Sequence, residues 1–504
     1  MNHRKPLCFL LVLLMLASAC LAACSGGEEK DPVNSGAVTD PSGTPVTSAP
    51  APETEPPDPD TVHDLPADLD FEGANFTMAS VEGWSCLAND YRGEVVNDAK
   101  YEVKCYAQDL LNVNVTENFE VLAGNTVGSN VVLNYVLSGD TDVQVFNLLD
   151  RDAAANTLEE IFLPISRMRY VDLSKKYWGS STSEKLPFGD YQFLALDSFQ
   201  LNSLRNAGCI FMNLTVAENY NLPVPYDLVE NGTWTLDALG QYDGAAQHDV
   251  DGDGKLTHED VTTFGSYDSR QLLLNVMSGA AVPFIEKDAD NLPVFTCFGN
   301  EKLLNVMEWT RALFFNPATM VAVEGDEMNI MYTQDMFVHD RQLFLTSKLG
   351  MMPLSADMES VFAVFPYPKY DEAQQNYVAR AVDAIFPMVI NSIDEETADM
   401  TGAVLEAMSA YAYQYLFPAV VESSLQFRYN NDPRSTAFIK LVYDSRTIEL
   451  SDMFVWDLFG DTPTFRMIYK DTAPSTWLAS IQSKAENILD DYIDDIRYLV
   501  KGLK

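Results

Sequence analysis

The sequence predicts an α/β protein built from two lobes. Segments with the composition of strands alternate with segments of helical periodicity along a body of roughly residues 67–504. This alternation is typical of α/β domains, in which helices cover the faces of a mostly parallel sheet. A body of about 440 residues is longer than one hydrophobic core supports, so it indicates two lobes or more.

The first part of the body should open with a strand at 76–80 and continue into a helix within 93–113. The apolar residues of the second segment recur at helical spacing, and Asn97 or Asp98 is expected to cap the helix. A strand of buried character is then expected within 138–148.

Strands and helices continue to alternate in the rest of the body. A strand is expected within 190–199, and residues 206–223 should begin as a strand and continue as a helix. Residues 362–370 are expected to be extended, because their prolines disfavour a helix. Residues 394–426 and the carboxyl-terminal stretch from Thr476 have the periodicity of amphipathic helices.

Residues 248–261, HDVDGDGKLTHEDV, have the pattern of a calcium-binding loop. Such a loop places oxygen ligands at positions 1, 3, 5, 7 and 12, and a glycine at position 6 makes its sharp turn. An acidic, solvated turn without metal is the alternative, but the pattern favours a bound Ca²⁺. The five ligand positions fall on Asp249, Asp251, Asp253, Lys255 (through its carbonyl) and Asp260.

A single loop of this kind favours a structural role for the ion. Sensor loops usually come in pairs, each between two helices that open on binding. Residues 234–247 before the loop can form a helix with Thr235 as its N-cap, whereas residues 261–269 after it carry β-branched residues and glycine. We therefore expect the ion to clip a helix to the following strand.

The amino terminus has the pattern of a bacterial lipoprotein signal peptide. Residues 1–23 combine a short basic start with an apolar run that ends in small residues. The sequence Leu-Ala-Ala-Cys at 21–24 resembles a lipobox, in which Cys24 would receive a lipid and become the mature amino terminus. A cleaved signal peptide with an incidental cysteine is the alternative.

Residues 24–66 are expected to form a disordered tether between the lipid and the body. Proline, serine, threonine, glycine and acidic residues dominate this segment, and it has too few large apolar residues to form a core. With the lipid on Cys24, we expect the protein on the extracellular face of the bacterial cytoplasmic membrane.

The composition argues against several classes of function. The formal net charge of −42 repels nucleic acid. The chain has five histidines and no G-x-S-x-G, H-E-x-x-H or phosphate-loop motif, so we do not expect an enzyme. A surface glycosidase with paired carboxylates is the alternative. Cys86, Cys105, Cys209 and Cys297 of the body do not have metal-like spacing, and whether any of them pair is left open.

Several motifs carry a resemblance to a known family of bacterial proteins. One motif of that family is almost fully matched by PYPKYDEAQQNY at 366–377. GEVVNDAKYE at 93–102, GDTDVQVF at 139–146 and VDLSKKYWG at 171–179 are similar to other segments of that family. The family also has an insertion made of a helix, a calcium-like loop and a strand. The loop at 248–261 of this chain is similar to the loop of that insertion. By these motifs the chain resembles the extracellular solute-binding proteins of family 1, which are lipoproteins of bacterial ABC importers, in the long form of Gram-positive anaerobes.

The resemblance implies the two-lobed fold of periplasmic binding proteins, in which two α/β lobes close on a ligand in the cleft between them. Lobe 1 would then comprise residues 67–197 and 367–418. Lobe 2 would comprise residues 198–366 and 419–504, and it would contain the calcium-like loop.

The resemblance also implies a function. The chain would capture a small solute, with an oligosaccharide as the leading candidate, and deliver it to the transmembrane subunits of an ABC permease. A surface module for adhesion or assembly that uses the calcium-like loop is the alternative from another class.

Ligand contacts in such a cleft come from aromatic rings, which stack on sugars, and from polar side chains, which bind hydroxyl groups. For each tryptophan, packing in the core is the alternative. The candidate ligand-binding residues are Trp84, Asp142, Trp178, Asp197, Trp234 and Arg341.

Overall fold

The computed structural model describes residues 58–123, 129–179, 182, 185–267, 271–314, 316, 319, 330–355, 358, 360–426, 433–460, 462–464, 466–467 and 472–503. All of them belong to one compact unit, Pro57–Lys504. The predicted signal peptide, Cys24 and most of the predicted tether lie outside the described residues. Across those residues, no helix combines the length and the apolar character that a membrane crossing requires.

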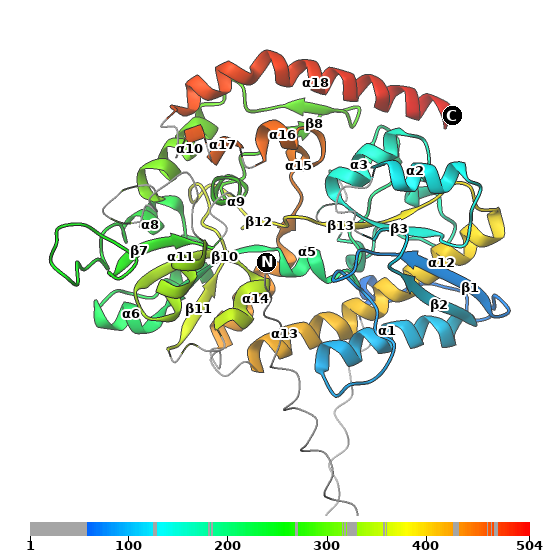
Figure 1. Ribbon diagram of the computed structural model, residues 1–504, viewed down its shortest axis with the longest axis horizontal. Helices are drawn as coiled ribbons and strands as arrows, with labels where there is room; N and C mark the ends of the chain where they lie inside the picture. Colours follow the sequence, from blue (N-terminus) through cyan, green and yellow to red (C-terminus); the bar gives the residue numbers. More distant parts are fainter. Residues whose placement is uncertain are drawn as a thin grey trace, which may run out of the picture. The chain divides into compact units, whose positions relative to one another are not determined.

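One four-stranded sheet lies in the segments predicted for lobe 1 (Figure 1). β1, β2 and β3 run parallel, and β13 runs antiparallel to β3. In spatial order the strands are β13 (Ile385–Val389), β3 (Val145–Leu149), β1 (Ala74–Ala79) and β2 (Val113–Asn118). The helices α1 (Val95–Leu111) and α12 (Glu395–Tyr411) pack against each other beside this sheet.

A second four-stranded sheet lies in the segments predicted for lobe 2 (Figure 1). β6 runs antiparallel to both of its neighbours, and β10 and β7 run parallel. In spatial order the strands are β11 (Phe362–Phe365), β6 (Gly208–Asn213), β10 (Gln342–Lys348) and β7 (Thr262–Ser266).

Shorter elements complete the described part of the chain. The two-stranded ladders are β4 (Pro187–Phe188) with β5 (Tyr191–Gln192), β8 (Ile285–Lys287) with β9 (Pro293–Phe295), and β12 (Ala379–Arg380) with β14 (Arg446–Thr447). The 3₁₀ turns are η1 (Pro59–Thr61), η2 (Ile165–Arg167), η3 (Lys176–Trp178) and η4 (Leu349–Ser355), and η5 (Ala412–Leu416) is a π-helical turn.

The remaining α-helices follow in chain order. In the first half of the chain they are α2 (Ser129–Leu137), α3 (Asp150–Leu158), α5 (Leu201–Arg205), α6 (Leu214–Asn219), α7 (Tyr226–Glu230) and α8 (Leu236–Gly240). In the second half they are α9 (Leu272–Gly279), α10 (Glu301–Phe314), α11 (Ile330–Val338), α13 (Phe417–Gln426), α14 (Pro433–Asp444), α15 (Leu450–Phe454), α16 (Trp456–Phe459), α17 (Thr462–Thr464) and α18 (Pro474–Gly502).

The long helix predicted at 394–426 is confirmed as α12, η5 and α13 in succession. Asp394 is its N-cap, and the Asp394 carboxylate accepts the N–H of Thr397 at 2.8 Å. Every residue from Met400 to Ala410 is buried, which is typical of a helix packed on all sides.

The predicted cap of the first helix was wrong. α1 begins at Val95 with Glu94 at the N-cap position, and the Glu94 side chain makes no capping hydrogen bond. The Asp98 carboxylate instead accepts the N–H groups of Arg92 at 2.8 Å and Gly93 at 3.1 Å, which precede the helix. Asp98 therefore fixes the entry of the chain into α1 from inside the helix.

The strand predicted within 190–199 is confirmed only at β5. After β5 the chain crosses toward α5 and β6 without a ladder partner in the described sheets. The Asp197 carboxylate accepts the N–H groups of Phe199 at 2.9 Å and Gln200 at 2.6 Å. These side-chain bonds turn the backbone toward α5 and take the place of sheet bonds.

The end of the predicted tether, residues 58–66, packs on the folded body, so its predicted disorder does not hold there. The Lys175 ammonium group donates to the carbonyl of Pro59 at 3.1 Å. The His63 Nε2 lies 2.7 Å from the hydroxyl oxygen of Tyr106 in α1. A polar segment cannot form its own core, but it can lie along a folded surface that supplies hydrogen-bond partners.

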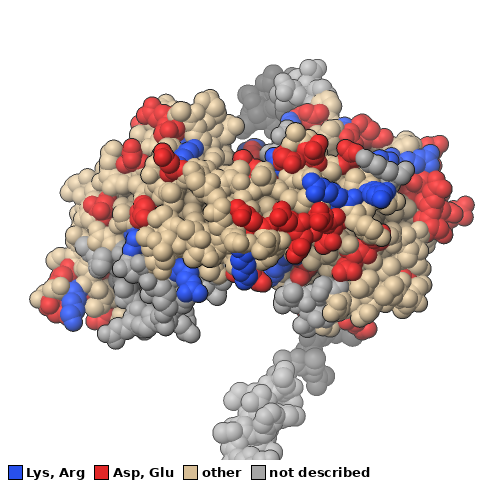
Figure 2. Space-filling view, turned by 90° about the horizontal axis from the view of Figure 1, so that it is seen from above, with Lys and Arg blue, Asp and Glu red and all other residues tan. Residues whose placement is uncertain are grey.

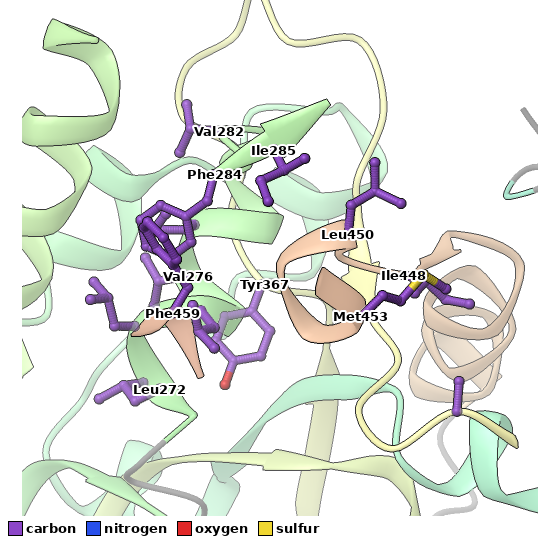
Figure 3. Close-up of a cluster of buried hydrophobic side chains, with 14 of the residues drawn as sticks. Leu272, Val276, Val282, Phe284, Ile285, Tyr367, Ile448, Leu450, Met453 and Phe459 are labelled. Atoms are coloured by element: carbon purple, nitrogen blue, oxygen red, sulfur yellow. The ribbon is translucent and has the colours of Figure 1, made fainter. Parts of the chain in front are cut away.

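The carboxyl-terminal segments join the two lobes. Figure 3 shows a buried hydrophobic cluster in which Leu450 of α15 lies near Ile285 of β8, and Val276 of α9 lies near Phe284 and Phe459. The rings of Phe284 and Phe459 have centroids 4.5 Å apart. α15 also packs against α3 in lobe 1. This segment therefore contacts both lobes through apolar side chains.

The acidic composition is visible on the face of the protein that carries α18. Figure 2 shows this face, where Asp and Glu side chains outnumber the basic ones. Asp490, Asp491, Asp494 and Asp495 of α18 are exposed. Such a surface agrees with the formal net charge of −42 and keeps like proteins apart in solution.

Candidate functional site

Two segments cross between the lobes, residues 193–207 and residues 379–384. Ala207 and Ala381 form an isolated bridge between the two crossovers. β6 begins directly after the first crossover, and β13 begins directly after the second. Both strands run antiparallel to their neighbours, so their first residues lie beside the last residues of those neighbours.

The strand registers place the carboxyl edges of both sheets at this crossing. Gly208, the first residue of β6, is paired with Lys348, the last residue of β10. Ile385, the first residue of β13, is paired with Leu149, the last residue of β3. In open α/β sheets, ligands bind outside the carboxyl ends of the strands. The crossing is therefore the candidate functional site.

A buried ion pair holds the centre of this site. Arg380 of β12 has no exposed surface, and its Nη2 and Nε lie 2.7 and 3.1 Å from the two carboxylate oxygens of Asp452 on α15. Its Nη1 donates to Oε1 of Gln271, the residue before α9, at 2.6 Å. A bidentate pair fixes both the position and the plane of the guanidinium.

Asp150, the first residue after β3, is a buried acid of the same site. Its N–H donates to the carbonyl of Ala384 in the second crossover at 2.9 Å. Burial, followed by the nearby charge of Asp452, raises the pKa of Asp150 to about 8. Carboxyl groups with strongly raised pKa values gather at functional sites. Near neutral pH, Asp150 can therefore donate a hydrogen bond as well as accept one.

Arg151 and Trp456 form a more open part of the site. The Arg151 side chain is 26% exposed, and its Nη1 lies 3.7 Å from Oδ1 of Asp383, whose side chain is 40% exposed. The Arg151 guanidinium lies over the Trp456 ring, 5.3 Å from its centroid. This arrangement places donors and acceptors for hydroxyl groups beside an indole ring.

Two of the predicted ligand-binding residues lie at this crossing. Trp84 is half-buried in the loop that follows β1, at the carboxyl edge of lobe 1. Asp197 lies in the first crossover and is 2% exposed. The Asp197 Oδ2 is buried and has no hydrogen-bond partner among the described residues.

Replacing Asp197 with asparagine is expected to flatten the dependence of stability on pH. Burial raises the pKa of Asp197 to about 8, so the folded protein favours the protonated carboxyl group. Its stabilising contribution is complete below the unfolded pKa of about 4, and it is lost by up to about 1.4 kcal/mol per pH unit as pH rises toward 8. The asparagine side chain would keep an acceptor for the N–H groups of Phe199 and Gln200 and would not ionise.

Urea unfolding at about pH 5 and about pH 8 tests this expectation. The wild-type protein should lose more free energy of unfolding between the two pH values than Asp197→Asn does. Equal losses would show that Asp197 does not titrate in this range.

Asp142 and Arg341 lie at the opposite edges of the sheets. Asp142 is exposed and precedes β3, so it is at the amino edge of lobe 1. Arg341 precedes β10, at the amino edge of lobe 2, and forms an ion pair with Asp335. The structure therefore does not bring these two predicted residues to the crossing.

Trp178 and Trp234 are packed in the core, which is the alternative that the sequence left open. Both side chains have no exposed surface. The Trp178 indole N–H donates to Glu406 at 2.7 Å, and the Trp234 indole N–H donates to the carbonyl of Pro366 at 3.0 Å. Because burial leaves neither ring open to a solute, we remove both from the candidate site.

The calcium-like loop folds so that three of its predicted ligands converge. Carboxylate oxygens of Asp249, Asp251 and Asp253 all lie within 4.8 Å of one another. The two Asp249 oxygens accept the N–H groups of Gly252 and Gly254, each at 2.7 Å. These bonds lower the pKa of Asp249, with the Gly254 bond as the largest cause. A concave set of carboxylate oxygens is the ligand type that Ca²⁺ prefers.

The fourth predicted carboxylate, Asp260, is buried beneath the loop. It is 1% exposed, and its oxygens accept the N–H groups of Val250 at 2.7 Å and Thr257 at 2.6 Å. Asp260 is not part of the converging group. It braces the loop from within, and Thr235 at the start of α8 caps the preceding helix as predicted. The strand that follows the loop is β7.

Sequence reasoning missed most of the polar residues at the crossing. Asp150 and Arg151 had a usable signal, because they directly follow the buried strand predicted within 138–148. Arg380 and Asp452 are 72 residues apart, and no spacing rule pairs them. Only the fold brings this pair together.

No protein-family model and no curated protein sequence matches this chain. Solved structures do match it. UspC from M. tuberculosis aligns with a TM-score of 0.55 at 12% identity, over 82% of this chain and 100% of that chain. UgpB from Mycobacterium tuberculosis, in complex with glycerophosphocholine, aligns with a TM-score of 0.53 at 13% identity, over 84% of this chain and 99% of that chain.

A cyclo/maltodextrin-binding protein complexed with maltotetraose aligns with a TM-score of 0.54 at 12% identity, over 84% of this chain and 97% of that chain. At these identities the similarities concern the fold. They confirm the predicted two-lobed α/β fold of periplasmic binding proteins.

Proposed function

We propose that this chain is the solute-binding receptor of an ABC importer and that its ligand is a sugar, with an oligosaccharide as the leading candidate. The main support is the convergence of both carboxyl edges on one polar site, because a two-lobed binder holds its ligand between the lobes. Two proteins of the same fold were solved with the hydroxyl-bearing ligands glycerophosphocholine and maltotetraose.

The residues of the crossing suit such a ligand. Arg151 and Asp383 offer donors and acceptors for hydroxyl groups, and Trp456 and Trp84 offer aromatic rings for the apolar face of a sugar. Arg151 comes from the segments predicted for lobe 1, whereas Trp456 comes from those predicted for lobe 2, and neither side chain is fully buried. A solute that touches both residues binds the closed form better than the open form, and this difference drives closure.

The proposal is tested with the chain from residue 25 onward in a thermal-shift screen of mono- and oligosaccharides, polyols and peptides. A ligand that binds only the native state stabilises it by about 2.7 kcal/mol at a hundredfold excess over its Kd. We expect a neutral saccharide to raise the Tm and to be recovered unchanged. A saccharide that is consumed would instead favour a glycosidase.

Replacing Arg151 with alanine is expected to weaken binding of that saccharide by about tenfold or more, which corresponds to about 1.4 kcal/mol. Calorimetric titration measures the change. Arg169→Ala is the matched control, because Arg169 also pairs with an aspartate of lobe 1, Asp399, at 2.9 Å. Equal affinity of Arg151→Ala and the control would contradict a binding site at the crossing.

The anchoring and the partner belong to the same proposal. Lipid on Cys24 would hold the receptor on the extracellular face of the cytoplasmic membrane, and the closed form would dock on the permease. Metabolic labelling with a fatty acid tests the anchor, because Cys24→Ser should abolish the label while leaving the body folded.

We also propose that the loop at 249–260 binds one Ca²⁺ with a structural role. Support comes from the converging oxygens of Asp249, Asp251 and Asp253, to which the Lys255 carbonyl would be added, while Asp260 would brace the loop from beneath. The ion would neutralise carboxylates that otherwise repel one another and would fix the turn between α8 and β7.

Calcium is therefore expected to raise the Tm of the protein, and the change Asp249→Asn with Asp251→Asn should abolish the rise. Differential scanning fluorimetry with and without CaCl₂ measures it. The change Asp494→Asn with Asp495→Asn, at exposed acids of α18, is the control and should leave the rise intact. A rise that persists in the loop variant would place the ion elsewhere.

A further inference from the structure

A hollow lies against the crossovers and is lined by residues from both lobes. Its volume is about 300 Å³, at the lower end of the range for small-molecule sites. Lys176 of η3 lines it from lobe 1, and Lys440 and Tyr443 of α14 line it from the other side. α14 is held to the sheet of lobe 2, because the N–H of Val364 in β11 donates to the Ser435 hydroxyl at 2.8 Å.

The crossovers form another wall of this hollow. Leu196 of the first crossover and Arg446 of β14 both line it. In the ladder of β12 and β14, Arg446 is paired with Ala379, and Arg380 is paired with Thr447. Neighbouring residues of a strand point to opposite faces. Arg446 therefore faces the hollow, while Arg380 faces the candidate ligand-binding site on the other side of the ladder.

The side chains that line the hollow suit a small anion. Three of them are cationic, Lys176, Lys440 and Arg446, and one is acidic, Asp444, in a chain with a formal net charge of −42. A locally basic hollow on so acidic a protein concentrates anions at this place. Lys176 pairs with Asp58 and Lys440 pairs with Asp444, so an anion would have to exchange with these carboxylates.

Aromatic groups specify the rest of the ligand. Tyr413 and Tyr443 both line the hollow, and the Arg446 guanidinium lies 3.8 Å from the centroid of the Tyr443 ring. The ring and its hydroxyl offer an apolar surface and hydrogen bonds beside the cations. A hydroxylated carboxylate such as a sugar acid combines the matching features, whereas a neutral sugar lacks the charge.

We propose that this hollow is a second binding site, which takes a small hydroxylated anion and couples its binding to the closure of the lobes. Its walls belong to different lobes, so its width changes when the lobes rotate about the crossovers. A ligand that prefers one width shifts the equilibrium between open and closed forms. The anion site is inferred from the residues that line the hollow alone. Its coupling to closure rests on the proposed function.

The test uses sodium glucuronate as the probe and glucose as the neutral control, in calorimetric titrations of the chain from residue 25 onward at low salt. We expect glucuronate to bind and glucose not to bind. The double variant Lys176→Gln with Lys440→Gln should bind glucuronate about tenfold more weakly or not at all. Because these side chains are 45% and 60% exposed, the variant should fold.

Lys484→Gln is the matched control, because Lys484 is exposed on α18 away from the hollow lining, and it should bind as the wild type does. Absence of glucuronate binding, or equal binding by the double variant, would overturn the anion site. Glucuronate should also change the affinity for the saccharide, and the saccharide should change the affinity for glucuronate by the same factor.

The two proposals fail separately. Glucuronate binding without any saccharide ligand would overturn the proposed function and support the anion site. Saccharide binding whose affinity does not change with glucuronate would overturn the coupling.

Discussion

Replacing Arg380 with methionine is expected to lower the free energy of unfolding by about 3–5 kcal/mol and to abolish binding of the solute. The change leaves the carboxylate of Asp452, which is 1% exposed, without its cation, and it leaves the Gln271 amide oxygen without that donor. Urea unfolding measures the loss, and calorimetric titration measures the binding.

A double variant separates the lost charge from the lost packing. Arg380→Met with Asp452→Leu removes both charges, so it should recover much of the stability that Arg380→Met loses. Burial raises the pKa of Asp452 even beside Arg380, and loss of Arg380 would raise it further. Protonation then removes the unpaired charge, so the deficit of Arg380→Met should shrink as the pH falls. A deficit that grows on acidification would contradict the role of this pair.

Replacing Glu406 with alanine is the second large effect, with an expected loss of about 3–4 kcal/mol in the free energy of unfolding. Glu406 is 1% exposed, and its carboxylate accepts hydrogen bonds from the Tyr177 hydroxyl, from the Trp178 indole N–H at 2.7 Å and from the Asp172 N–H at 3.3 Å. Alanine leaves these buried donors without an acceptor and also leaves a cavity. Chemical denaturation at neutral pH measures the loss.

Glu406→Gln controls for the volume of the side chain. Glutamine keeps one carbonyl acceptor, so it should lose less stability than alanine does. Burial raises the pKa of Glu406 to about 6. The wild-type protein should therefore lose stability as the pH rises from about 4.5 to about 6, and Glu406→Gln should lack that component. Equal losses in the two variants would show that the cavity contributes little and that loss of the carboxylate sets the cost.

Local patterns predicted much of the fold. The strand at 76–80 overlaps β1, and the switch from strand to helix within 206–223 is β6 followed by α6. These predictions depend on periodicity over a few residues, which sequence displays directly. The calcium-like loop is equally local, and the convergence of its three aspartates follows from ligands that alternate along one turn.

The candidate site was predictable only in part, because its residues come from separate segments. Trp84 was selected by its position after a strand, and the same rule applied to the end of β3 would have given Asp150. Arg380, Asp452 and Trp456 meet only through the crossovers and the carboxyl-terminal segment.

The burial of Trp178 and Trp234 also could not be predicted from the sequence. An aromatic residue that packs in a core and one that binds a sugar have the same local sequence pattern. The acceptor of the Trp178 indole N–H is Glu406, which lies 228 residues away. The burial of Trp178 therefore could not be read from its neighbours in sequence.

Hydrogen–deuterium exchange with and without the saccharide found in the screen shows whether the solute binds at the crossing. A solute held between the carboxyl edges should slow amide exchange at residues 80–84, 149–152 and 379–384, which lie on lobe 1 and the second crossover. The amino edges at 140–143 and 339–342 should exchange as before. Protection at the amino edges with no change at the crossing would contradict a binding site at the crossing, because the solute would then bind elsewhere.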